Sequence, residues 1–193
     1  MKIDYVNLKT QWLNERKDLL PIIDKVLSTG EFVGGDEVNK FEKNILKLTN
    51  SKYSVSLNSG TDALTLALYV LGVRKNDEVI TAPNSFIASA SCIVHLGAKP
   101  VFVDVDKDLN INPDLIEKKI TKKTKAIIAV HLTGKMAKMS KIISIAKKYK
   151  IKVIEDAAQS IGSKFKKKLA GSYGEIGCFS AHPLKNLNAF GDS

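Results

Sequence analysis

The sequence predicts an α/β fold in which a mainly parallel β-sheet lies between two layers of helices. From residue 53 onward, short apolar segments alternate with longer segments of helical periodicity, which is the pattern of repeated β-α units. Some short segments, such as 126–130 (AIIAV), are apolar throughout, as expected for a strand buried on both faces. Polar residues follow these segments directly, at the edge where parallel sheets bind ligands. We therefore expect a three-layer α/β/α domain with a site at that edge.

The length of the chain fits one domain. Its 193 residues are 44% hydrophobic and 26% charged, which allows one substantial core and is unlike a disordered chain. The apolar runs are far shorter than the ~20 residues that a membrane-spanning helix needs. The first residues lack the apolar stretch of a signal peptide, and Cys92 and Cys178 form neither a disulfide framework nor a CxxC motif. A reducing cytoplasm is the expected location.

The formal net charge of +10 raises the question of a nucleic-acid partner. Of the 30 basic residues, only Arg16 and Arg74 are arginine. Lysine lacks the planar, bidentate donors that arginine offers to phosphates and bases. The lysine-rich stretches also contain almost no aromatic residues on which bases could stack. We interpret these stretches as solvated helix faces and loops, and we expect no nucleic-acid and no membrane partner.

The expected elements follow from periodicity and from helix-stop residues. Segment 8–27 reads as a helix with a kink at Pro21 and a stop at Gly30, and a second helix over 37–48 follows the capping residues 34–36. The expected strands are 53–57, 78–81, 100–105, 125–131, 152–155 and 177–180, and the helices between them are 61–71, 86–96, 113–120 and 136–149.

The segment Ser59-Gly60-Thr61 joins an expected strand to an expected helix. Backbone N–H groups at a helix start can bind a phosphate, and a glycine lets the ligand approach the backbone closely. The alternative is an ordinary helix cap made by Thr61. The chain contains neither GxxxxGK[ST] nor GxGxxG, which disfavours a nucleoside triphosphate or dinucleotide site.

Asp156 follows an apolar strand and precedes two alanines, which predicts a tight and partly dry environment. A carboxylate there needs a cationic partner or firm hydrogen bonds, and a protonated ring nitrogen of a ligand is one such partner. The alternative partners are backbone amides or a lysine. Gln159, three residues later, faces the same ligand if a helical turn begins here.

Lys185 differs from the other lysines because apolar and small residues surround it in sequence. A desolvated lysine loses proton affinity and becomes a usable nucleophile for carbonyl groups, although an ordinary surface lysine is the alternative. Phe86, after another expected strand, offers a ring for stacking. A phosphate site, an aspartate for a ring nitrogen, a stacking ring and a Schiff-base lysine are together what pyridoxal phosphate requires.

Six segments in this order make the chain similar to a known family. They are 30–35 (GEFVGG), 58–64 (NSGTDAL), 84–89 (NSFIAS), 130–134 (VHLTG), 155–160 (EDAAQS) and 179–187 (FSAHPLKNL). Across essentially its whole length, the chain resembles the DegT/StrS-type sugar aminotransferases, pyridoxal-phosphate enzymes of the aspartate-aminotransferase (type I) fold.

The resemblance implies a role for each matching residue. Lys185 is implied as the catalytic residue, which binds the cofactor covalently and moves a proton during the reaction. Asp156 would pair with the ring nitrogen, Gln159 would bond the phenolic oxygen and Phe86 would stack on the ring. The remaining implied cofactor-binding residues, at the phosphate, are Ser59, Gly60, Thr61 and Ser180. No metal is implied, and His182 receives no role.

The implied reaction moves an amino group from an amino acid, glutamate by family habit, to a nucleotide-linked ketosugar. It would serve the biosynthesis of amino sugars for surface polysaccharide or a glycosylated product, in a homodimer with shared active sites. Lys185 favours transamination, because related sugar dehydratases have histidine at this position. The alternatives are a non-catalytic regulatory or binding protein of the same fold, or another pyridoxal-phosphate enzyme such as a sugar dehydratase.

The resemblance also implies a division of the chain. Residues 1–50 would form an N-terminal helical segment packing on the large domain, and residues 51–193 most of that cofactor-binding domain, without the family's small C-terminal domain. Family members are roughly twice this length. We therefore expect the sequence to be an N-terminal fragment, incomplete as an enzyme.

Overall fold

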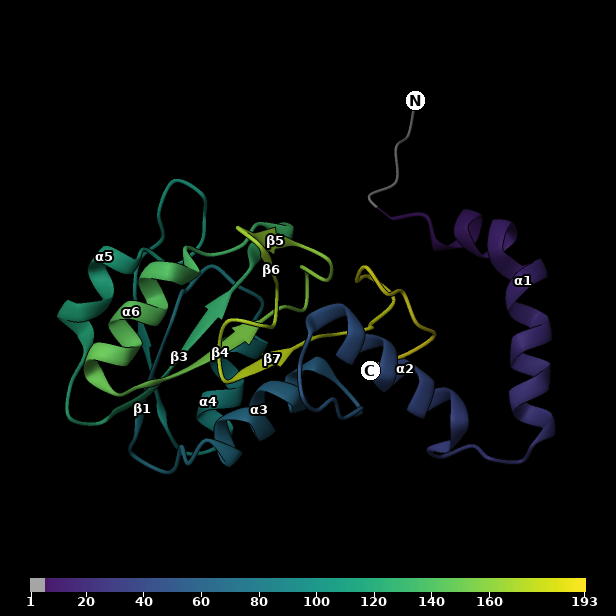
Figure 1. Ribbon diagram of the computed structural model, residues 1–193, viewed down its shortest axis with the longest axis horizontal. Helices are drawn as coiled ribbons and strands as arrows, with labels where there is room; N and C mark the ends of the chain where they lie inside the picture. Colours follow the sequence, from purple (N-terminus) through teal and green to yellow (C-terminus); the bar gives the residue numbers. More distant parts are fainter. Residues whose placement is uncertain (1–5) are drawn as a thin grey trace.

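The computed structural model describes residues 6–193 and contains a five-stranded sheet with helices on both faces (Figure 1). The strands are β1 (Glu78–Thr81), β2 (Lys99–Phe102), β3 (Thr124–Val130), β4 (Lys152–Asp156) and β7 (Ile176–Cys178). They lie in the order β2-β1-β3-β4-β7, and every neighbouring pair is parallel. The expected α/β fold with a mainly parallel sheet is confirmed.

Two layers of helices enclose the sheet. The helices are α3 (Gly60–Val70) and α4 (Ala88–His95) on one face, and α5 (Pro113–Ile116) and α6 (Met139–Tyr149) on the other. Strand β3 supplies both cores: Ile128 packs with residues of α3 and α4, and Ile127 packs with residues of α6. Successive side chains of a strand point to opposite faces, so the apolar run in β3 belongs between two helical layers. The remaining short elements are η1 (Glu117–Lys119), η2 (Leu132–Gly134), β5 (Lys164–Phe165) and β6 (Lys168–Leu169).

The expected strand at 53–57 is wrong, because this segment forms no strand. It runs without regular structure, with the Tyr53 and Val55 side chains 86% and 74% exposed. Its Ser56 N–H donates to the carboxylate of Glu42 at 2.7 Å. A strand exists only where a neighbour takes its backbone hydrogen bonds, and no strand of the described residues lies beside this segment. The segment instead lines a groove of about 840 Å³ together with α3 and the loops around β7.

The other elements differ from expectation mainly at their ends. The expected strands at 100–105 and 177–180 are shorter, and the helix expected from residue 136 begins at Met139. The expected helix at 113–120 is α5 followed by the 3₁₀ turn η1. Such end effects arise because capping and tertiary contacts decide the terminal turns.

The N-terminal helices α1 (Leu8–Ser28) and α2 (Gly35–Thr49) differ in their contact with the rest of the chain. Helix α1 contains no buried residue and runs through Pro21. It stands apart from the main body in Figure 1. The Trp12 ring meets the Phe190 ring edge-on, with centroids 5.7 Å apart, whereas α2 lies closer to the body, near β6. The division at residue 50, and the packing of residues 1–50 on the larger part, stay predictions.

Candidate functional site

The candidate site lies where the loops after β1, β4 and β7 meet the start of α3. Because all five strands are parallel, their carboxyl ends share one edge of the sheet. The predicted site residues come from these loops and from the start of α3, although up to about 126 residues separate them in sequence.

Asp156 is the last residue of β4, and its side chain is buried, with 6% exposed. The Ser89 hydroxyl on α4 donates to Oδ2 of Asp156 at 2.8 Å, and the Ala158 N–H donates to Oδ1 at 3.2 Å. Within residues 6–193, no lysine or arginine forms an ion pair with this carboxylate. The buried charge is therefore held by one hydroxyl and one backbone amide, and not by a lysine.

The start of α3 and the loop after β7 touch each other. Ser59 is the N-cap of α3, because its hydroxyl accepts the Asp62 N–H at 3.1 Å, so Ser59 caps the helix and Thr61 does not. A methyl group on Gly60 would lie 2.9 Å from Cβ of Ser180 and 3.3 Å from the Phe179 carbonyl oxygen. Position 60 therefore accommodates only glycine at this distance from Ser180 and Phe179. The backbone N–H groups of the first helical turn and the Ser180 hydroxyl therefore lie in one place, as an anion requires.

Lys185 and Phe86 come together from separate loops. Nζ of Lys185 lies 5.7 Å from the centroid of the Phe86 ring, within the range of a cation–π contact. The ring itself is 64% exposed. A short turn positions the lysine, with the Lys185 N–H donating to the His182 carbonyl at 2.8 Å. The apolar context of Lys185 in the sequence thus corresponds to an aromatic neighbour in space.

Gln159 points toward the turn η2. Its Oε1 accepts the Thr133 N–H at 2.8 Å, which ties the loop after β4 to the loop after β3. Its amide nitrogen donates to no group within residues 6–193. The Gln159 side chain is thus oriented by its oxygen while its N–H groups stay free to donate.

A second buried group, the pair Glu155 and His131, was not found from the sequence. Glu155 accepts four N–H donors: Nε2 of His131 at 2.9 Å and the backbone N–H groups of Gly171, Tyr173 and Gly174 at 2.5 to 3.0 Å. Because Nδ1 of His131 accepts the Ala137 N–H, the ring hydrogen lies on Nε2. The two acidic residues in a row at the end of β4 were the available signal. They face opposite layers, so only one belongs to the site.

The two cysteines lie on either side of Asp156, but their thiols are unreactive. Burial, together with the negative charge of Asp156, raises the pKa of the Cys92 thiol to about 12. Burial and the same charge also raise the pKa of Cys178. Both thiols therefore stay protonated at neutral pH, which excludes them as nucleophiles in the native state.

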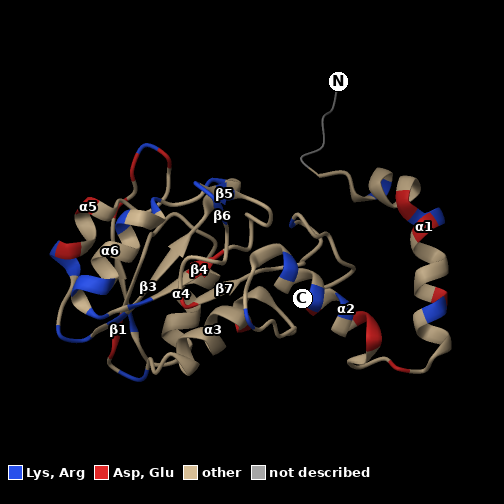
Figure 2. Cartoon of the chain, in the orientation of Figure 1, with Lys and Arg blue, Asp and Glu red and all other residues tan. Residues whose placement is uncertain are grey.

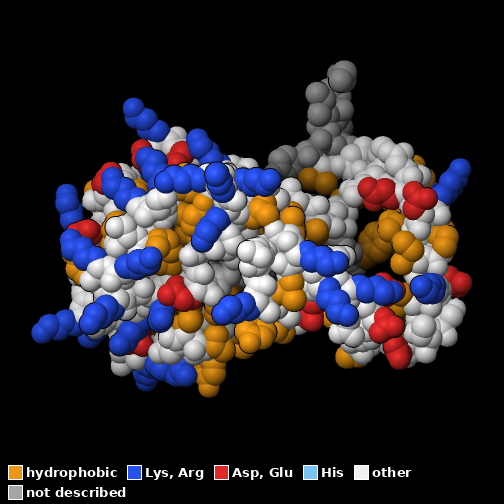
Figure 3. Space-filling model, viewed as in Figure 1, with side chains coloured by type: hydrophobic (Ala, Val, Ile, Leu, Met, Phe, Trp, Pro, Cys, Tyr) orange, Lys and Arg blue, Asp and Glu red, His pale blue; other side chains and the backbone are white. Residues whose placement is uncertain are grey.

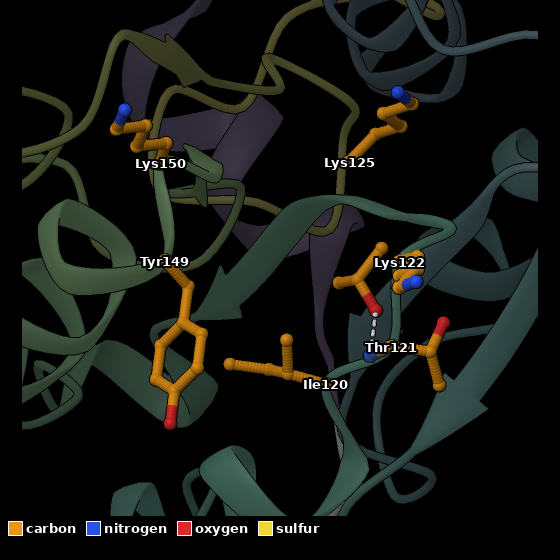
Figure 4. A pocket seen from close by; sticks show the side chains of 7 residues that line it. Ile120, Thr121, Lys122, Lys125, Tyr149 and Lys150 are labelled. Atoms are coloured by element: carbon orange, nitrogen blue, oxygen red, sulfur yellow. Dashed lines mark hydrogen bonds between the residues drawn. The ribbon is translucent and has the colours of Figure 1, made fainter.

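A second hollow lies at the opposite edge of the sheet, beside the start of β3 (Figure 4). Surface lysines surround it, including Lys122, Lys125 and Lys150, and the Thr121 N–H donates to the Thr124 hydroxyl. Lysines cover much of the surface of this part of the molecule (Figures 2 and 3). Between residues 118 and 168 the acidic residues are Glu155 and Asp156, and both are buried. The hollow has none of the convergent polar groups of the other edge.

Two kinds of feature are absent from the described residues. Among residues 6–193, no three His, Cys, Asp or Glu side chains lie together as metal ligands would. No helix in this part of the chain combines the length and the apolar character needed to cross a membrane.

Taken together, the fold and the candidate site define a parallel α/β domain with a helix start that closely approaches Ser180, a buried carboxylate, and a lysine beside an exposed aromatic ring. The model of the DegT/DnrJ/EryC1/StrS aminotransferase family matches residues 14–193, and the chain belongs to this family.

Named relatives are similar to this chain over most or all of its length. A pleiotropic regulatory protein from Geobacillus stearothermophilus is 42% identical over 100% of this chain and 52% of its own length. A UDP-2-acetamido-2-deoxy-3-oxo-D-glucuronate aminotransferase from Pseudomonas aeruginosa is 41% identical over 98% of this chain and 53% of its own. The crystal structure of NtdA from Bacillus subtilis with bound cofactor PMP has a TM-score of 0.88 and 39% identity, over 93% of this chain and 40% of that one. The chain spans about half the length of the curated relatives it matches.

Proposed function

We propose that this chain forms the cofactor-binding part of a pyridoxal-phosphate-dependent aminotransferase. The enzyme would move an amino group from an amino acid, glutamate being the expected donor, to a nucleotide-linked ketosugar. The main support is the meeting at one sheet edge of Nζ of Lys185 and the Phe86 ring, 5.7 Å apart. The 3-oxo sugar nucleotide named for the Pseudomonas relative supports the substrate class.

The residues present fit the cofactor on geometric grounds. The close approach of Gly60 to Ser180 leaves a cradle that any side chain at Gly60 would fill, and the backbone N–H groups that begin α3 lie beside it, as a phosphate needs. Asp156 is a buried carboxylate without a cationic side chain beside it in the described part of the chain. A protonated ring nitrogen would complete its partners.

Each residue then has a task. Pyridoxal phosphate, when bound, supplies a carbonyl carbon for amine exchange and a ring that withdraws electrons. Asp156 would hold a proton at the ring nitrogen, and Phe86 would cover one face of the ring and exclude water. Lys185 would bind the cofactor through Nζ and move a proton with the same atom. Gln159 would donate from its free amide nitrogen, and Ser180 from its hydroxyl, to oxygen atoms of the cofactor.

The test is the loading of purified protein with pyridoxal phosphate. We expect a visible absorbance band, and after borohydride reduction a mass increase on the peptide that contains Lys185. Lys185→Ala should abolish both signals. Lys147→Ala, which changes an exposed lysine on α6, is the matched control and should leave them unchanged. A wild-type protein that takes up no cofactor at saturating concentration contradicts the proposal.

Product analysis separates transamination from other reactions of the same cofactor. Loaded protein with glutamate should release 2-oxoglutarate and, with a ketosugar nucleotide, an aminosugar nucleotide in equal amount. Release of a deoxy sugar without amine transfer would instead indicate a dehydratase.

We also propose a homodimer with shared sites, as the resemblance implies. Sedimentation equilibrium of the protein tests this, and a monomer at all concentrations contradicts it.

The second candidate function is regulation without catalysis, which the name of the Geobacillus relative and the net charge of +10 favour. It predicts salt-sensitive binding of duplex DNA that survives Lys185→Ala. A flat titration with duplex DNA at low salt removes this candidate.

A further inference from the structure

A chain of hydrogen bonds joins the candidate site to the helix behind it. Asp156 accepts from the Ser89 hydroxyl at 2.8 Å, and the Ser89 oxygen lies 2.8 Å from the Ser85 oxygen. Ser89 is 1% exposed and Asp156 6% exposed, so water does not replace these bonds. Ser85 is partly buried and lies in the loop after β1.

The direction of the hydrogens follows from the acceptor at one end. An ionised carboxylate only accepts, so the single hydrogen of Ser89 points to Asp156. Ser89 then has no hydrogen left for Ser85, and Ser85 donates to Ser89. The hydrogen bond from Ser85 thereby supports the orientation in which the Ser89 hydroxyl donates to Asp156.

This series of hydrogen bonds also links two parts of the candidate site. Ser85 precedes Phe86 directly, and the Ser89 N–H donates to the Phe86 carbonyl at 3.2 Å. One short segment therefore holds the stacking ring through its backbone and the buried carboxylate through its side chains. The Ala158 N–H is the other donor to Asp156, at the longer distance of 3.2 Å.

We propose that Ser89 is a positioning residue for Asp156, with Ser85 orienting the Ser89 hydroxyl, so that the carboxylate meets a ring nitrogen of the ligand. The inference rests on the proposed function, because that function supplies the ring nitrogen. In this role Ser89 acts through Asp156 and not directly on the ligand. Its effect is on where the Asp156 oxygens point.

The experiment compares two probes that differ at one ring atom. The first is pyridoxal phosphate, and the second is its 1-deaza analogue, in which carbon replaces the ring nitrogen. Affinities are measured from the visible absorbance of the purified protein. The wild type should bind pyridoxal phosphate more tightly. Ser89→Ala should weaken binding of pyridoxal phosphate about tenfold, as expected for one lost hydrogen bond to a charged group, and should leave the affinity for the analogue within about twofold.

Three further variants distinguish positioning from packing. Ser91→Ala removes a hydroxyl from the same helix that has no bond to Asp156, and it should change neither affinity. Ser85→Ala should act in the same direction as Ser89→Ala but more weakly. In the Asp156→Asn background, Ser89→Ala should have no further effect on the difference between the probes.

The outcomes separate the two proposals. Equal weakening for both probes, or no weakening for either, overturns the role of Ser89. If Ser89→Ala does not fold, Ser85→Ala decides in the same way, because its hydroxyl is only partly buried. A wild-type protein that binds neither probe contradicts the proposed function itself.

Discussion

Helices α6 and α1 are both amphipathic in sequence, yet only α6 is packed. In α6, Met139, Ile142 and Ile145 are buried against the sheet. In α1, which is nearly twice as long, no residue is buried, and Leu20 is 52% exposed. Helical periodicity therefore specifies which face of a helix is apolar, but not the surface against which that face packs. Sheet strands β3 and β4 lie opposite α6, whereas α1 touches the body through Trp12 and Phe190.

Among substitutions that compare the packed sheet region with α1, we expect the largest loss of stability from a change at Glu155. Glu155→Gln replaces a carboxylate that accepts four N–H groups by an amide whose NH₂ faces donors. We expect a loss of about 3 to 5 kcal/mol in the free energy of unfolding, measured by urea denaturation. Glu15→Gln on α1 is the control and should change it by less than about 0.5 kcal/mol. Equal effects of the two changes would show that the network does not stabilise the sheet.

The second prediction compares apolar residues of the two regions. Ile127→Ala in β3 removes a side chain buried between the sheet and α6, and it should cost about 2 to 5 kcal/mol of unfolding free energy. Leu20→Ala in α1 should change it by no more than about 0.5 kcal/mol. The same urea experiment checks both. A large loss for Leu20→Ala would mean that α1 packs against the body in solution.

The third and smallest effect concerns pH and the buried thiols. Cys92 has a raised pKa, about 12, in the folded chain, whereas an unfolded thiol titrates near ~8.5. The folded state thus keeps a proton that the unfolded state loses. The stabilisation that the protonated Cys92 thiol gives the folded state is fully present below about pH 8.5. It is lost as the pH rises toward 12, by up to about 1.4 kcal/mol of unfolding free energy per pH unit.

Urea denaturation between pH 7 and pH 10 measures this loss. Cys92→Ala should flatten the decline relative to wild type, since one titrating thiol is gone. A decline that is the same in both proteins would contradict the assigned burial of the thiol. Helix α1 contains no cysteine, so apolar substitutions in α1 should leave this pH dependence of the unfolding free energy unaltered.

Much of the architecture followed from local patterns. The apolar run in β3 predicted a doubly buried strand, and the structure places Ile127 and Ile128 in opposite cores. The segment 53–57 alternates apolar residues with serine, as a half-buried strand does, but it forms no strand, because a strand needs a neighbour as well as a pattern. The contact of Lys185 with Phe86 was likewise not readable from spacing, since about 99 residues separate them.

The sequence by itself determined the fold class, and it indicated the edge of the sheet where the candidate site lies and the residue types gathered there. These follow from strand periodicity and from the parallel connection of strands, which are properties of the chain near each residue. Only the tertiary structure decided that Ser89 holds Asp156 while His131 holds Glu155, and that α6 is buried while α1 is exposed. Those outcomes depend on which surfaces meet across the fold, and no local pattern encodes the partner.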